Sequence, residues 1–323
     1  MSRNISKLIT NYVLFGLIFA SALSSISAQT FSNEKIWGGE FRSEGVWGIR
    51  SMANGSHYTV SDYDQDKGST IEKYSYNSGN KVSTIVTALD AFEDARESFS
   101  SYTFSTDERY ILMTTNTESL YRHSFYADFY IYDTKSKELA TPLTDFSKGK
   151  QRLATFSPSA DKVAFVRNNN VFIANLMDGT EVEVTDDGVA NSSINGATDW
   201  VYEEEFGLRD GFRSSPDGQS IAYQQIDTTG VQKFPLVNNT DSLYPTVTWF
   251  AYPKVGQKNP ACRVGVVNLE SGNTDWIRLP GDSRDNYVPK MDWADNSKEL
   301  LLQQFNRLQN ENRLYLVNVE VRP

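Results

Sequence analysis

Three consecutive glutamates are the most distinctive chemical feature of this sequence. They lie within residues 199–206, which read DWVYEEEF, so aromatic side chains surround them. Neighbouring residues of a strand point to opposite faces, whereas on a short helix they lie about 100° apart and their carboxylates can converge. Two convergent carboxylates would bind an ammonium group through hydrogen bonds of about 1.5–3 kcal/mol each. The other interpretation is a solvated face of a surface helix, and spacing alone does not decide between them.

A second candidate site residue is Arg122, which precedes His123 in the run LYRHS. The planar guanidinium of an arginine suits a carbonyl or a carboxylate. A structural ion pair with an acidic neighbour is the alternative for Arg122. His123 alone fits packing or hydrogen bonding better than catalysis.

A short helix must carry the glutamate run if its carboxylates are to converge. Thr198 or Asp199 can cap such a helix, because both side chains accept hydrogen bonds from free backbone N–H groups. The rest of the chain favours β structure, since 13% of its residues are aromatic and such residues suit pleated, half-buried surfaces.

The strands come in a repeated unit, in which a polar turn joins two apolar strands. Its clearest copy contains Ser-Pro-Asp-Gly, where proline presets φ, aspartate caps the turn and glycine takes a positive φ. Copies lie at residues 52–55, 104–108, 156–162, 214–218 and 293–297. Repeats of about 50 residues with three or four strands each indicate an all-β fold of propeller blades. A β-sandwich with coincidental turns is the alternative.

The last interval between repeats is the longest and contains an insertion from about Val231 to Cys262. An extended arm that leaves one blade would explain it.

Composition excludes several kinds of partner and site. The net charge is -10, so a nucleic-acid partner is not expected. Cys262 is the single cysteine, and the two histidines are His57 and His123. These counts exclude an intrachain disulfide and a cysteine- or histidine-rich metal site. We expect no metal and no organic cofactor.

The N-terminus has the order of a secretory signal peptide, which we place at residues 1–28. Arg3 and Lys7 precede an apolar run at residues 12–23, and small residues follow up to Ala28. This order predicts cleavage near Ala28 and export to the periplasm or the outside of the cell. An uncleaved membrane anchor is the alternative, although the run is shorter than the roughly 20 residues of a membrane span.

Several of the segments described above resemble those of a known protein family. The run DWVYEEEF is similar to the double-glutamate signature of the dipeptidyl peptidase IV family of serine peptidases. Residues 122–124, followed by the strand YIYD, resemble the conserved arginine segment of that family. Residues 252–260 resemble its extended arm. The resemblance covers nearly all of residues 40–323, in the order of the family.

The resemblance implies roles for three residues. Glu204 and Glu205 would hold the protonated N-terminus of a peptide substrate, and Arg122 would contact a substrate carbonyl. The whole enzyme would release N-terminal dipeptides of the Xaa-Pro or Xaa-Ala type. The segment from Val231 to Cys262 would help to form a homodimer.

The chain also departs from this family. Family members have an eight-bladed propeller followed by an α/β-hydrolase domain, in which the catalytic serine lies in a G-x-S-x-G motif. No such motif occurs here, and neither His57 nor His123 follows a candidate nucleophile.

We therefore expect residues 29–323 to form about five of the eight blades, with the hydrolase domain absent and no catalytic residue in the chain. Such a chain would be inactive alone and would need the missing hydrolase domain as its partner. Two other functions stay open: a stand-alone exported propeller that binds partners without catalysis, and a related prolyl-specific tripeptidyl or acyl-peptide enzyme.

Overall fold

The computed structural model describes residues 31–43, 45 and 48–320, so the expected signal peptide lies outside the described residues. The chain divides into two compact units, Met1–Trp47 and Gly48–Pro323. The first unit contains helix α2 (Asn33–Trp37), where the N-cap Ser32 accepts a hydrogen bond from the backbone N–H of Lys35 at 3.3 Å. The sheets and the candidate site all belong to the second unit.

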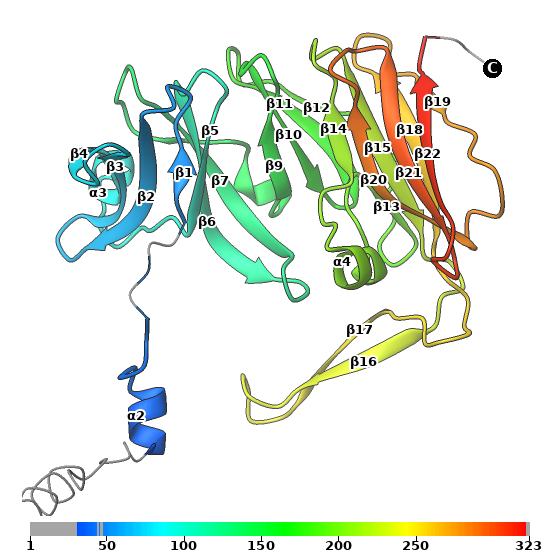
Figure 1. Cartoon of the computed structure of the whole chain (residues 1–323), viewed down its shortest axis with the longest axis horizontal. Helices are drawn as coiled ribbons and strands as arrows, with labels where there is room; N and C mark the ends of the chain where they lie inside the picture. Colours follow the sequence, from blue (N-terminus) through cyan, green and yellow to red (C-terminus); the bar gives the residue numbers. More distant parts are fainter. Residues whose placement is uncertain (1–30, 44, 46–47, 321–323) are drawn as a thin grey trace, which may run out of the picture. The chain divides into compact units, whose positions relative to one another are not determined.

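Five antiparallel sheets follow one another in chain order along the second unit (Figure 1). The first contains β1 (Arg50–Ser51), β2 (His57–Asp64), β3 (Gly68–Ser75) and β4 (Lys81–Thr87). The second contains β5 (Ser101–Phe104), β6 (Tyr110–Ser119), β7 (Phe125–Asp133) and β8 (Thr141–Pro142). The third contains β9 (Arg152–Phe156), β10 (Lys162–Arg167), β11 (Asn170–Asn175) and β12 (Glu181–Glu183).

The fourth and fifth sheets complete the series. The fourth contains β13 (Ser193–Asn195), β14 (Phe212–Ser214), β15 (Ser220–Asp227), β18 (Ala261–Asn268) and β19 (Thr274–Trp276). The fifth contains β20 (Asn286–Trp293), β21 (Glu299–Asn306) and β22 (Asn312–Asn318). The helical segments of this unit are α3 (Ala88–Phe92), the 3₁₀ helix η1 (Phe146–Lys148) and α4 (Trp200–Phe206).

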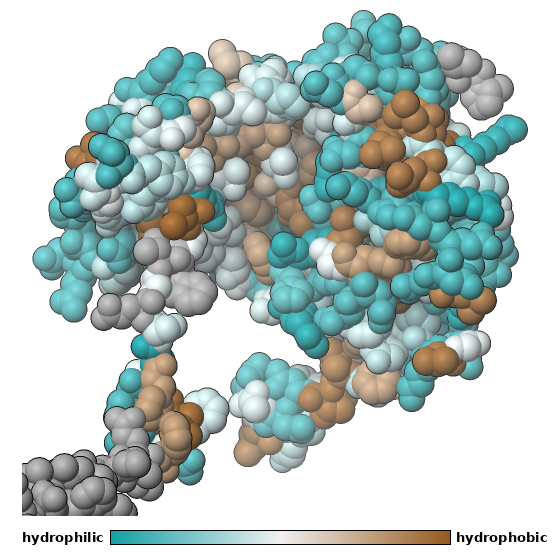
Figure 2. All heavy atoms as spheres, viewed as in Figure 1, coloured by the Kyte–Doolittle hydropathy of each residue, from teal (hydrophilic) through white to brown (hydrophobic). Residues whose placement is uncertain are grey.

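The predicted arm is confirmed as a separate two-stranded sheet of β16 (Lys233–Asn238) and β17 (Thr246–Ala251). It leaves the fourth sheet after β15 and returns to it at β18. Val237 and Val247 lie directly opposite each other across the arm, and both are about half exposed. Figure 2 shows hydrophobic and hydrophilic atoms mixed along this segment.

The five repeated turns occupy similar places, because each joins two successive antiparallel strands of one sheet: β1 and β2, β5 and β6, β9 and β10, β14 and β15, and β20 and β21. The turn after β14 has the predicted chemistry: Asp217 accepts a hydrogen bond from the Ser215 hydroxyl at 2.6 Å, and Gly218 has a φ of +68°. In every copy a backbone N–H donates to the carbonyl five residues later. These pairs are Met52 and His57, Ser105 and Tyr110, Ser157 and Lys162, Ser215 and Ser220, and Ala294 and Glu299.

Several of these turns also bond to the turn of a neighbouring sheet. The backbone N–H of Ala53 donates to the Glu108 carboxylate at 2.5 Å. The Thr106 hydroxyl donates to the carbonyl of Pro158 at 2.8 Å. The N–H of Asp217 donates to the Ser297 hydroxyl at 3.0 Å. These contacts, together with an isolated bridge between Ala127 and Gln151, join neighbouring sheets that remain separate over the described residues.

Each neighbouring pair of sheets shares a hydrophobic core. The first core contains Ile71 of the first sheet with Ile111 of the second. The next joins Phe129 of the second sheet to Phe165 of the third. The largest joins the third, fourth and fifth sheets and includes Val201 and Tyr202 of α4. The chain is therefore nearly all β, as predicted, and α4 is fixed by the core on which the last three sheets depend.

Candidate functional site

Helix α4 carries the glutamate run, as the sequence predicted. Asp199 is its N-cap and accepts a hydrogen bond from the backbone N–H of Tyr202 at 3.2 Å. Gly207 ends the helix in a left-handed conformation, and its N–H donates to the carbonyls of Tyr202 and Glu203. The buried face of this short helix, including Tyr202, anchors it to the sheets.

The three glutamates differ sharply in environment, because successive helical residues point about 100° apart. Glu203 is only 2% exposed. The Glu204 side chain is 19% exposed, and Glu205 is exposed. Glu203 is therefore separated in environment from Glu204 and Glu205, and the three carboxylates do not form one cluster.

Glu203 connects α4 to the turn between β6 and β7. Its Oε1 accepts hydrogen bonds from the backbone N–H groups of His123 at 2.7 Å and Ser124 at 3.1 Å. Its Oε2 accepts from the Ser124 hydroxyl. Hydrogen bonds to a charged acceptor contribute about 1.5–3 kcal/mol each, so this side chain holds the two segments together. This role of Glu203 was not predicted from the sequence, although three successive carboxylates on a helix cannot all face one ligand.

Arg122 and Glu204 are brought together by that connection. Arg122 Nε lies 3.4 Å from Glu204 Oε1, and the arginine side chain is 71% exposed. An ion pair this exposed contributes about 0–1 kcal/mol, so it does not carry the fold. The guanidinium keeps most of its donors towards solvent, where a ligand can reach them.

Glu205 is the third predicted site residue. Within the described part of the chain, its carboxylate has neither an ion-pair partner nor a hydrogen-bond donor. It follows Glu204 directly on α4 and is open to solvent. His123 is exposed too. Its backbone N–H is held by the hydrogen bond to Glu203.

Aromatic rings attach the base of the arm to both site segments. The Phe250 ring lies 5.9 Å from Tyr121, next to Arg122, and 6.1 Å from Trp200 at the start of α4. Tyr252 lies closer still to Trp200, with 4.1 Å between ring centroids. Such pairs contribute about 0.5–1.5 kcal/mol beyond their burial. The arm therefore packs against both segments that carry the site residues and helps to hold them in place.

Burial shifts the acidity of several groups around α4. It raises the pKa of Asp199 to about 6 and the pKa of the Tyr121 phenol to about 12. Burial likewise raises the pKa of Cys262 to about 12, so this thiol stays protonated and is no nucleophile.

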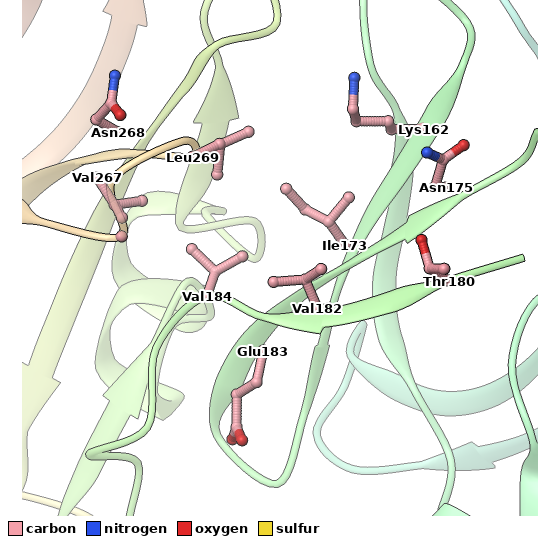
Figure 3. A pocket seen from close by; sticks show the side chains of 11 residues that line it. Lys162, Ile173, Asn175, Thr180, Val182, Glu183, Val184, Val267, Asn268 and Leu269 are labelled. Carbon is pink, nitrogen blue, oxygen red and sulfur yellow. The ribbon is translucent and has the colours of Figure 1, made fainter. Parts of the chain in front are cut away.

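Three further features of the described residues bear on what the chain could bind. Among residues 31–43, 45 and 48–320, no group of three or more histidine, cysteine, aspartate or glutamate side chains could hold a metal ion. Over the same ranges, no helix combines the length and apolar character that crossing a bilayer requires. A hollow of about 170 Å³ lies between the third and fourth sheets, where Ile173, Val182 and Val184 face Val267 and Leu269 (Figure 3). Its wall is mainly aliphatic, so we interpret this hollow as part of the packing between the two sheets.

Comparison with known proteins places these features in a family. Residues 105–322 match the family model described as the dipeptidyl peptidase IV (DPP IV) N-terminal region. A curated protein of Emericella nidulans, described as "Probable dipeptidyl peptidase 4", is 35% identical over 246 residues, which are 74% of this chain and 31% of that protein. Dipeptidyl peptidase 4 of Trichophyton rubrum is 32% identical over 249 residues, covering 75% of this chain and 32% of the relative.

A solved structure agrees with these sequence matches. The crystal structure of Porphyromonas gingivalis dipeptidyl peptidase 4 superposes with a TM-score of 0.82 at 37% identity, covering 91% of this chain and 41% of that one. The chain thus spans about a third of the length of the curated relatives it matches. The expected resemblance is confirmed, and the chain belongs to the dipeptidyl peptidase IV family, whose N-terminal region it matches.

Proposed function

We propose that this chain is the part of a dipeptidyl peptidase that holds the N-terminal amine of a peptide. Glu204 and Glu205 bind the ammonium group, and Arg122 contacts a backbone carbonyl near the bond to be cleaved. The whole enzyme would release Xaa-Pro or Xaa-Ala dipeptides, with a serine hydrolase domain as the partner of this chain. The observation that carries the proposal is the 3.4 Å contact between Arg122 and Glu204, which joins two segments far apart in sequence.

The chemistry of the three side chains fits this role. An ammonium has three donors, and two acidic side chains on one exposed end of α4 offer acceptors with charge. Arg122 is paired with Glu204 only loosely, so an arriving ammonium can take over Glu204 and free the guanidinium for a carbonyl. Fixing the amine in this way would limit how far a peptide extends towards a catalytic serine, which is a positioning effect.

The setting of the protein is part of the same proposal. The signal-like N-terminus supports export to the periplasm or the outside of the cell. Exported peptides with free N-termini would then be the substrates.

The test is binding of short peptides to the purified chain, measured by calorimetry. We expect the tripeptide Ala-Pro-Ala to bind and its N-acetylated form to bind at least about tenfold more weakly, because acetylation removes the charge of the amine. Glu204→Gln and Glu205→Gln should each weaken binding of the free peptide to a similar extent. Equal affinity for the free and acetylated peptides would refute the proposal.

Glu118→Gln is the matched control. Glu118 lies on β6, which leads into the same hairpin, its side chain is 69% exposed, and its partner is Lys150 rather than a site residue. This variant removes one negative charge near the site and should leave the affinity for Ala-Pro-Ala unchanged. A loss equal to that of Glu204→Gln would show that only the general field of the surface matters.

A further inference from the structure

A second cavity lies behind the amine site. It has a volume of about 230 Å³ and lies between the β6–β7 hairpin, the segment before α4 and the base of the arm. One water needs only about 10–15 Å³, so the cavity has room for an organic group. Its apolar wall includes Leu120, Tyr126, Leu236, Trp249 and Phe250. None of Arg122, Glu204 and Glu205 lines it.

Arg152 lines this cavity and is an unusual residue to bury. It is only 4% exposed, and its Nε and Nη2 have no hydrogen-bond partner among the described residues. Burial lowers the pKa of its guanidinium, whereas the nearby charge of Glu203 acts in the other direction. Glu203 accepts its hydrogen bonds from His123 and Ser124 instead of from Arg152.

Nε and Nη2 form one edge of the guanidinium, with two parallel N–H donors. That edge matches the two oxygens of a carboxylate, and the resulting bidentate pair is among the strongest hydrogen-bonded contacts in proteins. A buried cation with two unpaired donors is costly, so an anion that reaches them gains more than it would at the surface.

Asp199 supplies a second unused group on the wall of the same cavity. It is 2% exposed, and its Oδ2 accepts no hydrogen bond, whereas its Oδ1 caps α4. A carboxyl oxygen is an acceptor, which suits a backbone amide N–H of a ligand.

We propose that this cavity binds a carboxylate that carries an adjacent amide and an apolar side chain, as at the C-terminal residue of a peptide. Arg152 binds the carboxylate, Asp199 accepts the amide N–H, and the aromatic wall contacts the apolar side chain. The site recognises the end of a peptide opposite to the one held by Glu204 and Glu205. It stands independently of the proposed function, because its residues and its ligand group are different.

The test uses N-acetylated probes, which have no free amine and so cannot use the amine site. Binding of N-acetyl-phenylalanine, of N-acetyl-Ala-Ala-Phe and of the C-terminal amide of each is measured by calorimetry on the full chain. We expect the carboxylates to bind at least about tenfold more tightly than their amides. Tighter binding of the tripeptide would identify a peptide C-terminus as the ligand, and equal binding would identify a single N-acyl amino acid.

Two variants locate the site. Arg152→Met should abolish the preference for the carboxylate, and Arg152→Lys, which keeps the charge but loses the flat two-donor edge, should reduce it about tenfold. Arg109→Met is the matched control, because Arg109 forms its ion pair with Asp133 on the second sheet and does not line the cavity. Its affinities should equal those of the unmodified chain.

The proposal fails if acid and amide probes bind equally, or if neither binds at millimolar concentration. It also fails if Arg152→Lys, folded by circular dichroism, keeps the full preference for the carboxylate. A preference that survives in both Arg152 variants would place the anion elsewhere on the surface.

Discussion

The carboxylate of Glu203 accepts hydrogen bonds from both the backbone N–H and the hydroxyl of Ser124, a residue 79 positions earlier in the chain. Through this contact the turn that carries Arg122 is fixed to the helix that carries Glu204. The first glutamate of the run is thus a positioning residue for the other two, and it is the one least exposed to a ligand.

Glu203→Ala should lower the free energy of unfolding by about 2–3 kcal/mol, because it leaves two backbone donors and one hydroxyl without their charged acceptor. Glu205→Ala should change it by less than about 0.5 kcal/mol, since its carboxylate is exposed. Denaturant titration of both variants measures this difference. Hydrogen exchange at the amides of His123 and Ser124 should accelerate in Glu203→Ala only, and unchanged protection there would contradict the assignment.

Asp199 should make the protein less stable as pH rises. Burial raises its folded-state pKa to about 6 from the ordinary value of 3.8, so the folded state binds the proton more tightly than the unfolded state. Stability from this group is therefore present below about pH 4 and is lost as pH rises through 6, by on the order of 3 kcal/mol. Asp199→Asn should remove this pH dependence, as measured by unfolding at pH 4, 5, 6 and 7.

Asp217 provides the control of opposite sign. The Ser215 hydroxyl and neighbouring backbone N–H groups lower the pKa of Asp217. Its contribution should be lost as pH falls, so Asp217→Asn should cost stability at neutral pH and little in acid. The Asp199 assignment is wrong if both asparagine variants change the pH profile in the same direction.

Two equally buried arginines should respond differently to replacement by methionine. Arg167 is 5% exposed and forms two hydrogen bonds with Glu181, which would keep Lys148 as its ion-pair partner, so Arg167→Met should cost about 1–3 kcal/mol. Arg152 has no such bond at Nε or Nη2, and Arg152→Met should be neutral or stabilising. Thermal unfolding compares them, and a large loss in Arg152→Met would mean that the arginine is structural.

The arm offers a surface for a second copy of the chain, and we propose that it forms a homodimer contact. Val237 and Val247 face each other across β16 and β17 and are 53% and 49% exposed. Val237→Asp combined with Val247→Asp would place two like charges side by side on this surface and should shift a dimer to monomer. Light scattering after size exclusion measures the mass. Leu314→Asp combined with Leu316→Asp, on β22, is the control and should leave the mass unchanged.

Turn chemistry is local, and for that reason the repeated sheets could be predicted from the sequence alone. Residues 214–218 contain the hydroxyl, the carboxylate and the glycine of their turn within five positions. The arm could be predicted because it lengthens one repeat. The helix that carries the glutamates could be expected because Asp199, a residue that can cap a helix, directly precedes it.

The division of work within the site could not be predicted in this way. The partners of Glu203 lie about 80 residues away, and no spacing within the run distinguishes it from Glu204. Arg152 is a lone arginine at the start of a strand. It becomes a candidate site residue only because the hairpin, the segment before α4 and the arm pack around it and bury it. Long-range contacts decide both cases.

The turns that bond from one sheet to the next make this fold resemble a one-dimensional chain of units. Turns contact those of neighbouring sheets, as Thr106 contacts Pro158 and Asp217 contacts Ser297. The stability of such a series is approximately a sum of unit terms and nearest-neighbour terms. Duplication or loss of a whole sheet during evolution would therefore disturb two junctions and leave the rest intact, which gives this architecture an inherent freedom to change its number of repeats.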